Sequence, residues 1–281
     1  MLNTDVFKDF NELNLFLRMH YQSEKLHTLV DVGANRGEFS RAFAKRGWRV
    51  IAFEPEPNNF RALTDNLKQF PNAHCISKAV SDVSGQQVTF YVSTEHSGIH
   101  SLKPFHTTHT QTITVETTRL EDTLATLGID SVTFLKIDTE GADFLALKGF
   151  NFNAGLPDFV MVEFMDERSQ NSYGYTHHDI VEYMKGTNYL TYIAEWGAIE
   201  QYGRSHQFLQ CRPYPLSSPP VWGNIIFVKP SHRETFERAL HRYLADLQYS
   251  KLVRSNGFRA FCKLPGIKQT VQSVKTVLQV F

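Results

Sequence analysis

Short apolar runs alternate with segments of helical period along most of the chain. Seven such runs predict β-strands: Leu29–Val32, Val50–Phe53, Ala73–Ser81, Val132–Ile137, Asp158–Phe164, Tyr189–Ala194 and Asn224–Val228. Between them, apolar residues at helical spacing predict helices at Glu38–Arg46, Pro57–Phe70, Leu120–Leu127, Ala142–Leu147 and Thr176–Lys185. Strands that alternate with helices build a largely parallel sheet covered on both faces. We therefore expect a doubly wound, seven-stranded α/β fold whose last two strands form an antiparallel hairpin.

The helical period is lost between the third and fourth predicted strands. Val88–Val92 and Thr112–Thr117 have the composition of β-strands, and a polar loop that contains Ser97–Leu102 lies between them. This pattern predicts a β insertion between strands 3 and 4, at the carboxyl edge of the sheet. Open α/β sheets bind their ligands at that edge, so we expect the loop to act as a lid over a binding site.

The two ends of the chain differ in pattern from its centre. Apolar residues at helical spacing in Val6–Tyr21 predict an amphipathic lead-in helix, and a second helix is predicted at Thr235–Leu247. Residues 251–281 are basic, contain no acid and have apolar faces. This tail fits attachment to an anionic membrane surface or a partner enzyme, and it fits equally a final helix packed on the domain. We expect a helical lead-in, a central domain and a C-terminal helix with its tail, at residues 1–24, 25–230 and 231–281.

The composition limits the classes of function and the cellular compartments that fit this chain. The 281 residues carry a formal net charge of zero at pH 7, so nothing indicates a nucleic-acid partner. The cysteines Cys75, Cys211 and Cys262 form no metal or disulfide pattern, which suggests a reducing compartment. The amino end lacks the pattern of a signal peptide, and no apolar run is long enough to span a membrane. We therefore expect a cytoplasmic protein, with any membrane association made through its tail.

The segment Asp31–Gly37 has the features of a loop that binds a nucleoside cofactor. A buried strand breaks at Gly33 and Gly37 and turns into a helix, which lets backbone N–H groups approach a ligand that side chains would block. The next predicted strand ends in Glu54, an acid placed to accept hydrogen bonds from both hydroxyls of a ribose. The end of the third strand, at Ser81, is expected beside the adenine, although this segment also fits a plain turn.

The glycine spacing distinguishes between cofactors. A dinucleotide fingerprint needs glycines at its first, third and sixth positions, but Asn35 and Glu38 occupy the last two when the count starts at Gly33. The pattern Asp-x-Gly-x-x-x-Gly is instead that of S-adenosylmethionine (SAM) enzymes, in which the loop has a charged methionine tail to hold and no pyrophosphate. An ordinary tight turn between a strand and a helix is the alternative.

Further segments extend this pattern in a fixed order. They are Phe53–Pro57, Ala79–Asp82, Ser101–Leu102, Leu120–Leu124, Lys136–Gly141, Val162–Glu163 and Asn224–Val228. Together with Asp31–Gly37 they make the chain resemble the FkbM-family methyltransferases over roughly residues 25 to 230. The Lys-Ile-Asp-x-Glu-Gly box is the most specific match. Glu121 and Asp143 differ from the residues usual in the family, but each keeps a carboxylate.

The resemblance implies a class I, Rossmann-like methyltransferase fold and transfer of a methyl group from SAM to a hydroxyl of a sugar, a glycolipid or a secondary metabolite. The expected acceptor is a small molecule or a glycan. Methylation of a nitrogen or a carboxylate on the same fold is an alternative, as is a non-catalytic SAM-binding partner tethered by its basic tail. The expected cofactor contacts are Asp31, Gly33, Ala34, Asn35, Gly37, Glu54, Ser81 and Asp138.

Methyl transfer to a hydroxyl requires groups that position the acceptor and take its proton. Asp138 and Glu140 end the fourth predicted strand, so both are expected at the carboxyl edge, and either could be the general base. In the alternative, Asp138 holds the methionine ammonium group and Glu140 caps the next helix. Glu163 interrupts an apolar strand and needs a partner if it is buried.

The predicted lid carries four histidines, at positions 96, 100, 106 and 109. Their spacing could supply metal ligands on a helix, but the segment has no helical pattern, so a solvated polar lid is the preferred interpretation. His100 is the one expected to contact the acceptor or to act as a base. No resident metal is predicted, although Asp138 and Glu140 together could hold a magnesium-like ion.

Overall fold

The computed structural model describes residues 11–19, 26–199, 202, 206–216, 218–220 and 222–254. The chain divides into two compact units, one of residues 1–19 with 237–281 and the other of residues 20–236. Among the helices of the described part, none is long and apolar enough to cross a lipid bilayer.

The smaller unit contains α1 (Glu12–Leu17) and most of α8 (Arg233–Arg254). Within it, the backbone N–H of Asn11 donates to the hydroxyl of Tyr243 at 3.1 Å. α1 lies inside the predicted lead-in helix, and the remainder of that helix lies outside the described residues. The side chains of the predicted basic tail also lie outside them.

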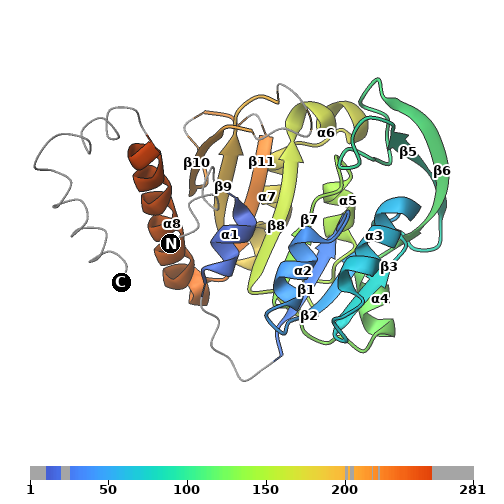
Figure 1. Ribbon diagram of the computed structural model, residues 1–281, viewed down its shortest axis with the longest axis horizontal. Helices are drawn as coiled ribbons and strands as arrows, with labels where there is room; N and C mark the ends of the chain where they lie inside the picture. The colour runs from blue at the N-terminus through green and yellow to red at the C-terminus, as the bar shows by residue number, and fades with distance from the viewer. Residues whose placement is uncertain are drawn as a thin grey trace, which may run out of the picture. The chain divides into compact units, whose positions relative to one another are not determined.

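The larger unit is built around an eight-stranded sheet (Figure 1). Its strands are β1 (Thr28–Val32), β2 (Arg49–Phe53), β3 (Ala73–Ile76), β7 (Phe134–Ile137), β8 (Phe159–Met165), β9 (Leu190–Trp196), β10 (Phe208–Pro213) and β11 (Trp222–Val228). They are ordered β10-β9-β11-β8-β7-β1-β2-β3. Neighbouring strands from β8 to β3 run parallel, and β11 runs antiparallel to both β8 and β9. The predicted doubly wound α/β fold is confirmed.

The sheet has one strand more than the sequence predicts. β10 pairs with β9 at the edge of the sheet and is mostly exposed or half-buried, so it has no continuous apolar run to mark it. The antiparallel pairing predicted for the last two strands is confirmed, because β11 runs antiparallel to β9. The two strands are not joined as a simple hairpin, since β10 lies between them in the sequence and pairs with the other edge of β9.

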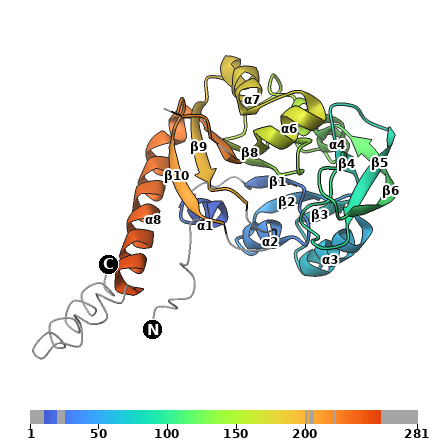
Figure 2. The same cartoon turned by 90° about the horizontal axis from the view of Figure 1, so that it is seen from above.

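Helices cover both faces of the sheet (Figure 2). α2 (Glu38–Ala44) and α3 (Pro57–Leu67) lie on one face, and α6 (Asp166–Tyr173) and α7 (His177–Met184) lie on the other. Two further helices, α4 (Leu120–Thr126) and α5 (Asp143–Lys148), precede and follow β7. α6 was not predicted, because its sequence, Asp-Glu-Arg-Ser-Gln-Asn-Ser-Tyr, has almost no apolar residue with which to show a helical period.

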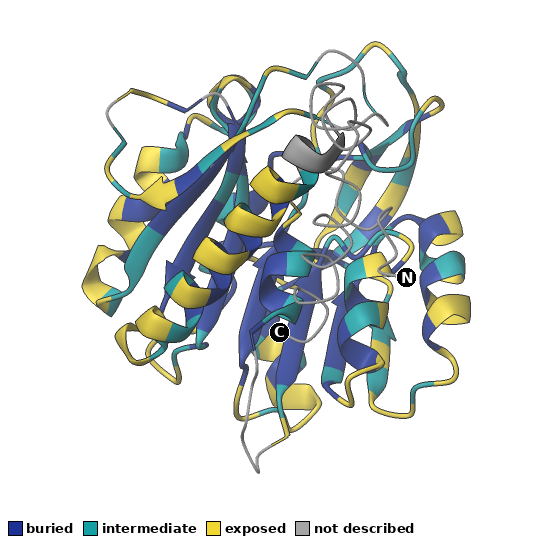
Figure 3. Ribbon diagram, turned by 60° about the vertical axis from the view of Figure 1, so that its left-hand side comes forward, coloured by how far each residue is buried: buried dark blue, intermediate teal, exposed yellow. Residues whose placement is uncertain are grey.

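The core lies between the sheet and these helices. β1 is buried at every position, and β7 likewise, which explains why both appear in the sequence as apolar runs. Figure 3 shows the strands of the main sheet as largely buried, whereas the helices have one buried and one exposed face. One cluster joins Val30, Ile51, Leu135, Val162 and Ile225, one residue from each of five strands.

Residues after β3 leave the main sheet and form a second one. The predicted third strand, Ala73–Ser81, is broken: β3 ends at Ile76, and β4 (Ala79–Val80) pairs with β6 (His109–Thr118). β6 pairs in turn with β5 (Gln87–Ser93), giving a three-stranded sheet in the order β4-β6-β5. Figure 1 shows β5 and β6 beyond the β3 edge, with their connecting loop near the carboxyl ends of the strands.

The ends of β1 and β7 approach each other very closely at Gly33. A Cβ atom at this position would lie 1.8 Å from the backbone oxygen of Asp138, and the φ angle of Gly33 is +73°. β1 is also the strand at which the order of the sheet reverses, because the chain runs from it to β2 and β3 on one side and returns to β7 on the other. Ligands of open α/β folds bind at such a switch point.

Replacing Gly33 by alanine should therefore cost far more stability than the same change at Gly47. Both residues have left-handed φ angles, +73° and +81°, but a Cβ at Gly47 meets no atom within 4 Å. Gly47→Ala should cost about 1 kcal/mol of backbone strain, and Gly33→Ala about 2–4 kcal/mol, since overpacking is added. Urea unfolding of both variants measures this. Equal losses would show that the contact with Asp138 is not a constraint.

Candidate functional site

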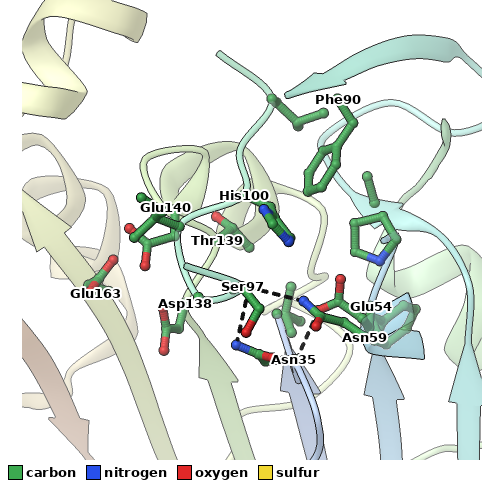
Figure 4. Close-up of a pocket in the computed structure, with 18 of the residues that line it drawn as sticks. Asn35, Glu54, Asn59, Phe90, Ser97, His100, Asp138, Thr139, Glu140 and Glu163 are labelled. Atoms are coloured by element: carbon green, nitrogen blue, oxygen red, sulfur yellow. Dashed lines mark hydrogen bonds between the residues drawn. The ribbon is translucent and has the colours of Figure 1, made fainter. Parts of the chain in front are cut away.

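A cavity of about 310 Å³ lies in the larger unit, at the carboxyl ends of β1, β2 and β7. Six of the residues predicted for the site line it: Gly33, Asn35, Glu54, His100, Asp138 and Glu140. Figure 4 shows Asn35, Glu54 and Asn59 on one side of this cavity and Glu140 and Glu163 on the other, with Asp138 between them. The first group is called the nucleoside end below, and the second the carboxylate end.

Glu54 follows β2 and is 5% exposed. Its Oε2 accepts the backbone N–H of Asn35 at 2.9 Å, and its Oε1 accepts that of Glu56 at 2.9 Å. Because a carboxylate oxygen has two lone pairs, each can accept a second hydrogen bond from the cavity. Burial raises the pKa of Glu54 to about 7, and the two backbone hydrogen bonds oppose this shift. Glu54 thus gives this end of the cavity a hydrogen-bond acceptor whose pKa lies near neutral pH.

The loop between β5 and β6 is fixed over the nucleoside end by two amides. The Nδ2 groups of Asn35 and Asn59 both donate to the backbone oxygen of Ser97, at 3.5 and 3.0 Å (Figure 4). Asn35 has a φ angle of +50°, which asparagine tolerates better than most residues. The loop residues 96–100 line the cavity as a result. Phe90 and Val80 line it as well, from the second sheet.

Asp31 does not line the cavity, contrary to its predicted role as a cofactor contact. It is fully buried in β1, where its Oδ2 accepts the hydroxyl of Ser40 at 2.7 Å and its Oδ1 lies 3.1 Å from Nζ of Lys136. Lys136 also lies 3.3 Å from Oδ2 of Asp138 and donates to the backbone oxygen of Gly33 at 3.3 Å. Burial favours the neutral amine, but the attraction of Asp138 and Asp31 raises the pKa of Lys136 overall. Asp31 therefore acts through Lys136, beneath the site.

Three other predicted cofactor contacts also lie off the cavity wall. The N–H of Ala34 donates to the backbone oxygen of Phe53 at 2.9 Å, and Gly37 is the N-cap of α2 with a φ angle of +84°. Ser81 is buried and its N–H donates to the oxygen of Thr118 in β6, at 2.9 Å. These three residues shape the loop and the second sheet. Ser81 is displaced because the chain leaves the main sheet after β3.

The loop from Asp138 to Gly141 is held by a carboxylate that the sequence did not single out for this role. Asp143, in the first turn of α5, accepts the N–H and the hydroxyl of Thr139 on Oδ1, at 2.7 and 3.0 Å, and the N–H of Gly141 on Oδ2, at 3.0 Å. The predicted alternative that Glu140 caps this helix is therefore wrong. Glu140 has a φ angle of +57°, and its backbone oxygen accepts the hydroxyl of Ser101 at 2.9 Å.

Arg168 on α6 is the main residue of the carboxylate end that the sequence did not reveal. Its Nη1 contacts Oε2 of Glu140 and lies 3.6 Å from Oε2 of Glu163, and its guanidinium lies 4.1 Å from the ring centre of Phe105. Glu163 thus has the partner that its burial required. Burial raises the pKa of Glu140 to about 7, against the attraction of Arg168. Burial, and then repulsion from Glu140 and Asp138, raises the pKa of Glu163 well above its usual value.

Asp138, Glu140 and Glu163 each offer a carboxylate oxygen within 4.8 Å of the others. In the described part of the chain, no other cluster of three acids, histidines or cysteines has that geometry. Oxygen ligands of this kind suit magnesium or calcium. Arg168 already places a positive charge beside two of the three acids.

His100 lines the cavity but is poorly placed to act as a base. Its Nδ1 accepts the backbone N–H of Ser93 at 2.9 Å, so the neutral ring carries its proton on Nε2. Burial lowers the pKa of His100, which favours this neutral form. His106 and His109 are engaged within the loop, since His106 contacts the hydroxyl of Thr108 and His109 contacts the oxygen of Ile99. The geometry makes His100 a hydrogen-bond donor to the cavity.

The fold and this cavity together define a class of protein. A glycine loop after β1, an acid after β2 and a cavity at the switch point of a doubly wound sheet are the features of class I, SAM-dependent methyltransferases. The family model described as the methyltransferase FkbM domain matches residues 31–193, more than half of the chain, and the chain belongs to that family. The resemblance seen in the sequence is confirmed.

Two curated relatives are methyltransferases. The chain is 24% identical over 155 residues to the 2-O-methyltransferase NoeI of Sinorhizobium fredii, and 27% identical over 143 residues to the hexuronic acid methyltransferase AglP of Haloferax volcanii. Each match covers 50% of this chain, and the matches cover 63% and 57% of the two relatives. The chain thus matches less than two thirds of the length of either relative.

A solved O-methyltransferase from Bacillus cereus, in complex with SAH, is also similar in structure. It has a TM-score of 0.43 at 11% identity, over 81% of this chain and 85% of that one. A similarity this distant adds nothing to the family assignment.

Lys136 should be essential for stability because its removal leaves the fully buried Asp31 without a counter-charge. Lys136→Met should lower the free energy of unfolding by about 3–5 kcal/mol. Lys68 is the matched control, since its side chain is 72% exposed in a pair with Asp65, and Lys68→Met should cost less than about 1 kcal/mol. Urea denaturation compares the two. A loss below about 1 kcal/mol in Lys136→Met would contradict the role assigned to the lysine.

Proposed function

We propose that this protein transfers the methyl group of SAM to a hydroxyl group of a sugar or of a sugar-containing small molecule. The observation that carries the proposal is one cavity with Glu54 at its nucleoside end and Asp138, Glu140 and Glu163 towards its carboxylate end. A nucleoside donor and a hydroxylated acceptor can therefore share a single site.

The residues at the nucleoside end fit a SAM-type ligand. Glu54 can accept hydrogen bonds from two ribose hydroxyls, and Val80 and Phe90 offer apolar surface to an adenine. Because Gly33 has no side chain, its backbone can lie against that of Asp138 at the floor of the cavity. Asp138, whose side chain is 39% exposed, is placed to accept from an ammonium group. SAM supplies an activated methyl group together with its own leaving group.

Glu140 is the residue that we assign as proton acceptor. It lines the cavity next to Asp138, and its pKa of about 7 is suited to taking a proton near neutral pH. Arg168 stabilises its ionised form, and Ser101 fixes its backbone through the hydrogen bond to its oxygen. Lys136 holds Asp138 in place. Asp138 and Glu140 therefore have separate roles, the first in holding the ammonium group of SAM and the second in accepting the proton.

The choice of a hydroxyl acceptor draws on the relatives as well as on the site. One relative is named for transfer to oxygen and the other for a hexuronic acid, which is a sugar. The carboxylate end agrees with this, because carboxylates accept hydrogen bonds from hydroxyl groups and can take their protons.

Calorimetry should detect binding of SAM and of its product S-adenosylhomocysteine, and no binding of NAD. Glu54→Gln should weaken the binding of SAM by about 1.5–3 kcal/mol, because a charged acceptor of ribose hydrogen bonds is lost. The affinity of the wild-type protein for SAM should fall as the pH drops from 8 to 6, since Glu54 with its pKa of about 7 becomes protonated. Glu121→Gln, on the surface next to Arg119, is the control. Unchanged affinity in a folded Glu54→Gln variant would remove Glu54 from the site.

Glu140→Gln should lower kcat by about a hundredfold or more and leave SAM affinity nearly unchanged. The acceptor for this assay comes from cell-extract fractions screened with labelled SAM. In the wild type, kcat should rise with pH through about 7 as Glu140 ionises, and this limb should vanish in the variant. Asp138→Asn should reduce both turnover and SAM affinity. Normal turnover in both variants would place the base elsewhere.

The same assay tests the possible ion site of Asp138, Glu140 and Glu163. Activity should survive a chelator, because the proposed base acts directly on the acceptor. Loss of activity in EDTA and its return with added magnesium would show that these acids are ligands, and would overturn the role of Glu140 as a simple base.

A further inference from the structure

The carboxylate end of the cavity continues past Glu163 to an aromatic wall. Glu163 in β8 lies opposite Asn224 of β11, and Trp222 lies two positions before Asn224 on the same strand. Residues two apart on a strand share a face of the sheet, so Trp222 and Glu163 are diagonal neighbours on one face. Trp222 and His206 both line the cavity.

Trp222 is locked in position by its neighbours. Its Nε1 donates to the backbone oxygen of Gly197 at 2.5 Å, and its ring stacks on Trp196 with centroids 6.0 Å apart. The ring of His206 meets it nearly perpendicularly, at 5.1 Å and 89°. Trp222 is 9% exposed, and because its indole N–H is already used, the surface that it offers the cavity is apolar carbon.

The polar surface beside this wall is acidic. Glu140 and Glu163 keep 17% and 14% of their side chains exposed, whereas Arg168 keeps 4%. Asp138 adds a third carboxylate, and the one guanidinium is already paired with two of them. A ligand carboxylate would add a fourth acid to this cluster, whose guanidinium is already paired, while a ligand with hydroxyl groups would find oxygen acceptors.

We propose that this end of the cavity is a subsite for an uncharged sugar ring, which places its C–H face on Trp222 and its hydroxyls on Glu163 and Glu140. The proposal rests on the function proposed above and narrows its acceptor to neutral sugars. By this proposal, the acceptor of this chain differs from that of the relative named for a hexuronic acid, which is 27% identical. An aromatic face for the ring and adjacent carboxylates for its hydroxyls explain why these side chains converge.

Saturation-transfer NMR on the full chain with saturating S-adenosylhomocysteine tests this directly. The probes are methyl glucopyranoside, methyl mannopyranoside and methyl galactopyranoside, with methyl glucuronide as the charged comparison. At least one neutral glycoside should bind, and the glucuronide should bind about tenfold more weakly or not at all. Glu163→Gln should reduce that preference, because it removes one of the three clustered acids.

Trp222→Leu should weaken the binding of the neutral glycoside by about tenfold. Trp222→Phe keeps an aromatic face and should weaken this binding by less than about threefold. Tyr249→Leu, an exposed aromatic on α8, is the control and should change nothing. If Trp222→Leu fails to fold, His206→Ala serves instead, because it removes the ring that contacts the indole. It should weaken the binding of the glycoside by about threefold.

The outcomes separate this inference from the proposed function. Binding of S-adenosylhomocysteine without any neutral glycoside, tighter binding of the glucuronide, or neutral binding unaffected by Trp222→Leu would each overturn the neutral-sugar subsite and leave methyl transfer standing. Failure to bind S-adenosylhomocysteine would instead contradict the proposed function itself.

Discussion

The carboxyl ends of β1 and β7 are held together by one buried lysine. Nζ of Lys136 lies within 3.3 Å of carboxylate oxygens of Asp31 and Asp138 and of the backbone oxygen of Gly33. Both walls of the cavity start from these two strand ends. The glycine loop leads to the nucleoside end, and the loop from Asp138 leads to Glu140. An error in their spacing would misplace the two ends of the cavity relative to each other, and the buried lysine with its two acids fixes that spacing.

The elements that the sequence predicts correctly are those whose burial leaves a simple pattern. β1 and β7 are buried at every position, and each appears as an apolar run. α6 and β10 escaped prediction because α6 is almost wholly polar and β10 is a half-exposed edge strand. The break in the third strand depends on the pairing of β4 with β6, a contact between distant segments that no local pattern contains.

The same division applies to the site. Glu54, Asp138 and Glu140 could be placed from sequence because they follow strands whose ends meet at one edge. Asp31 could not be distinguished from them, since its role depends on Lys136 in another strand. A signal was nevertheless present: an acid within an apolar strand, as at Asp31 and Glu163, requires a buried cation. A search for that cation leads to Lys136 on the neighbouring strand, but Arg168 lies in a helix that was itself unpredicted.

The proposed function rests on two carboxylate environments within one cavity, which we assign to a ribose and to hydroxyl groups with their protons. A crystal structure of the protein with S-adenosylhomocysteine tests this division most directly. We expect the ribose hydroxyls on Glu54 and the sulfur directed towards Asp138 and Glu140, with the region beside Glu163 and Trp222 left free for an acceptor. A nucleoside bound beside Trp222, or outside this cavity, would contradict the assignment of the two ends.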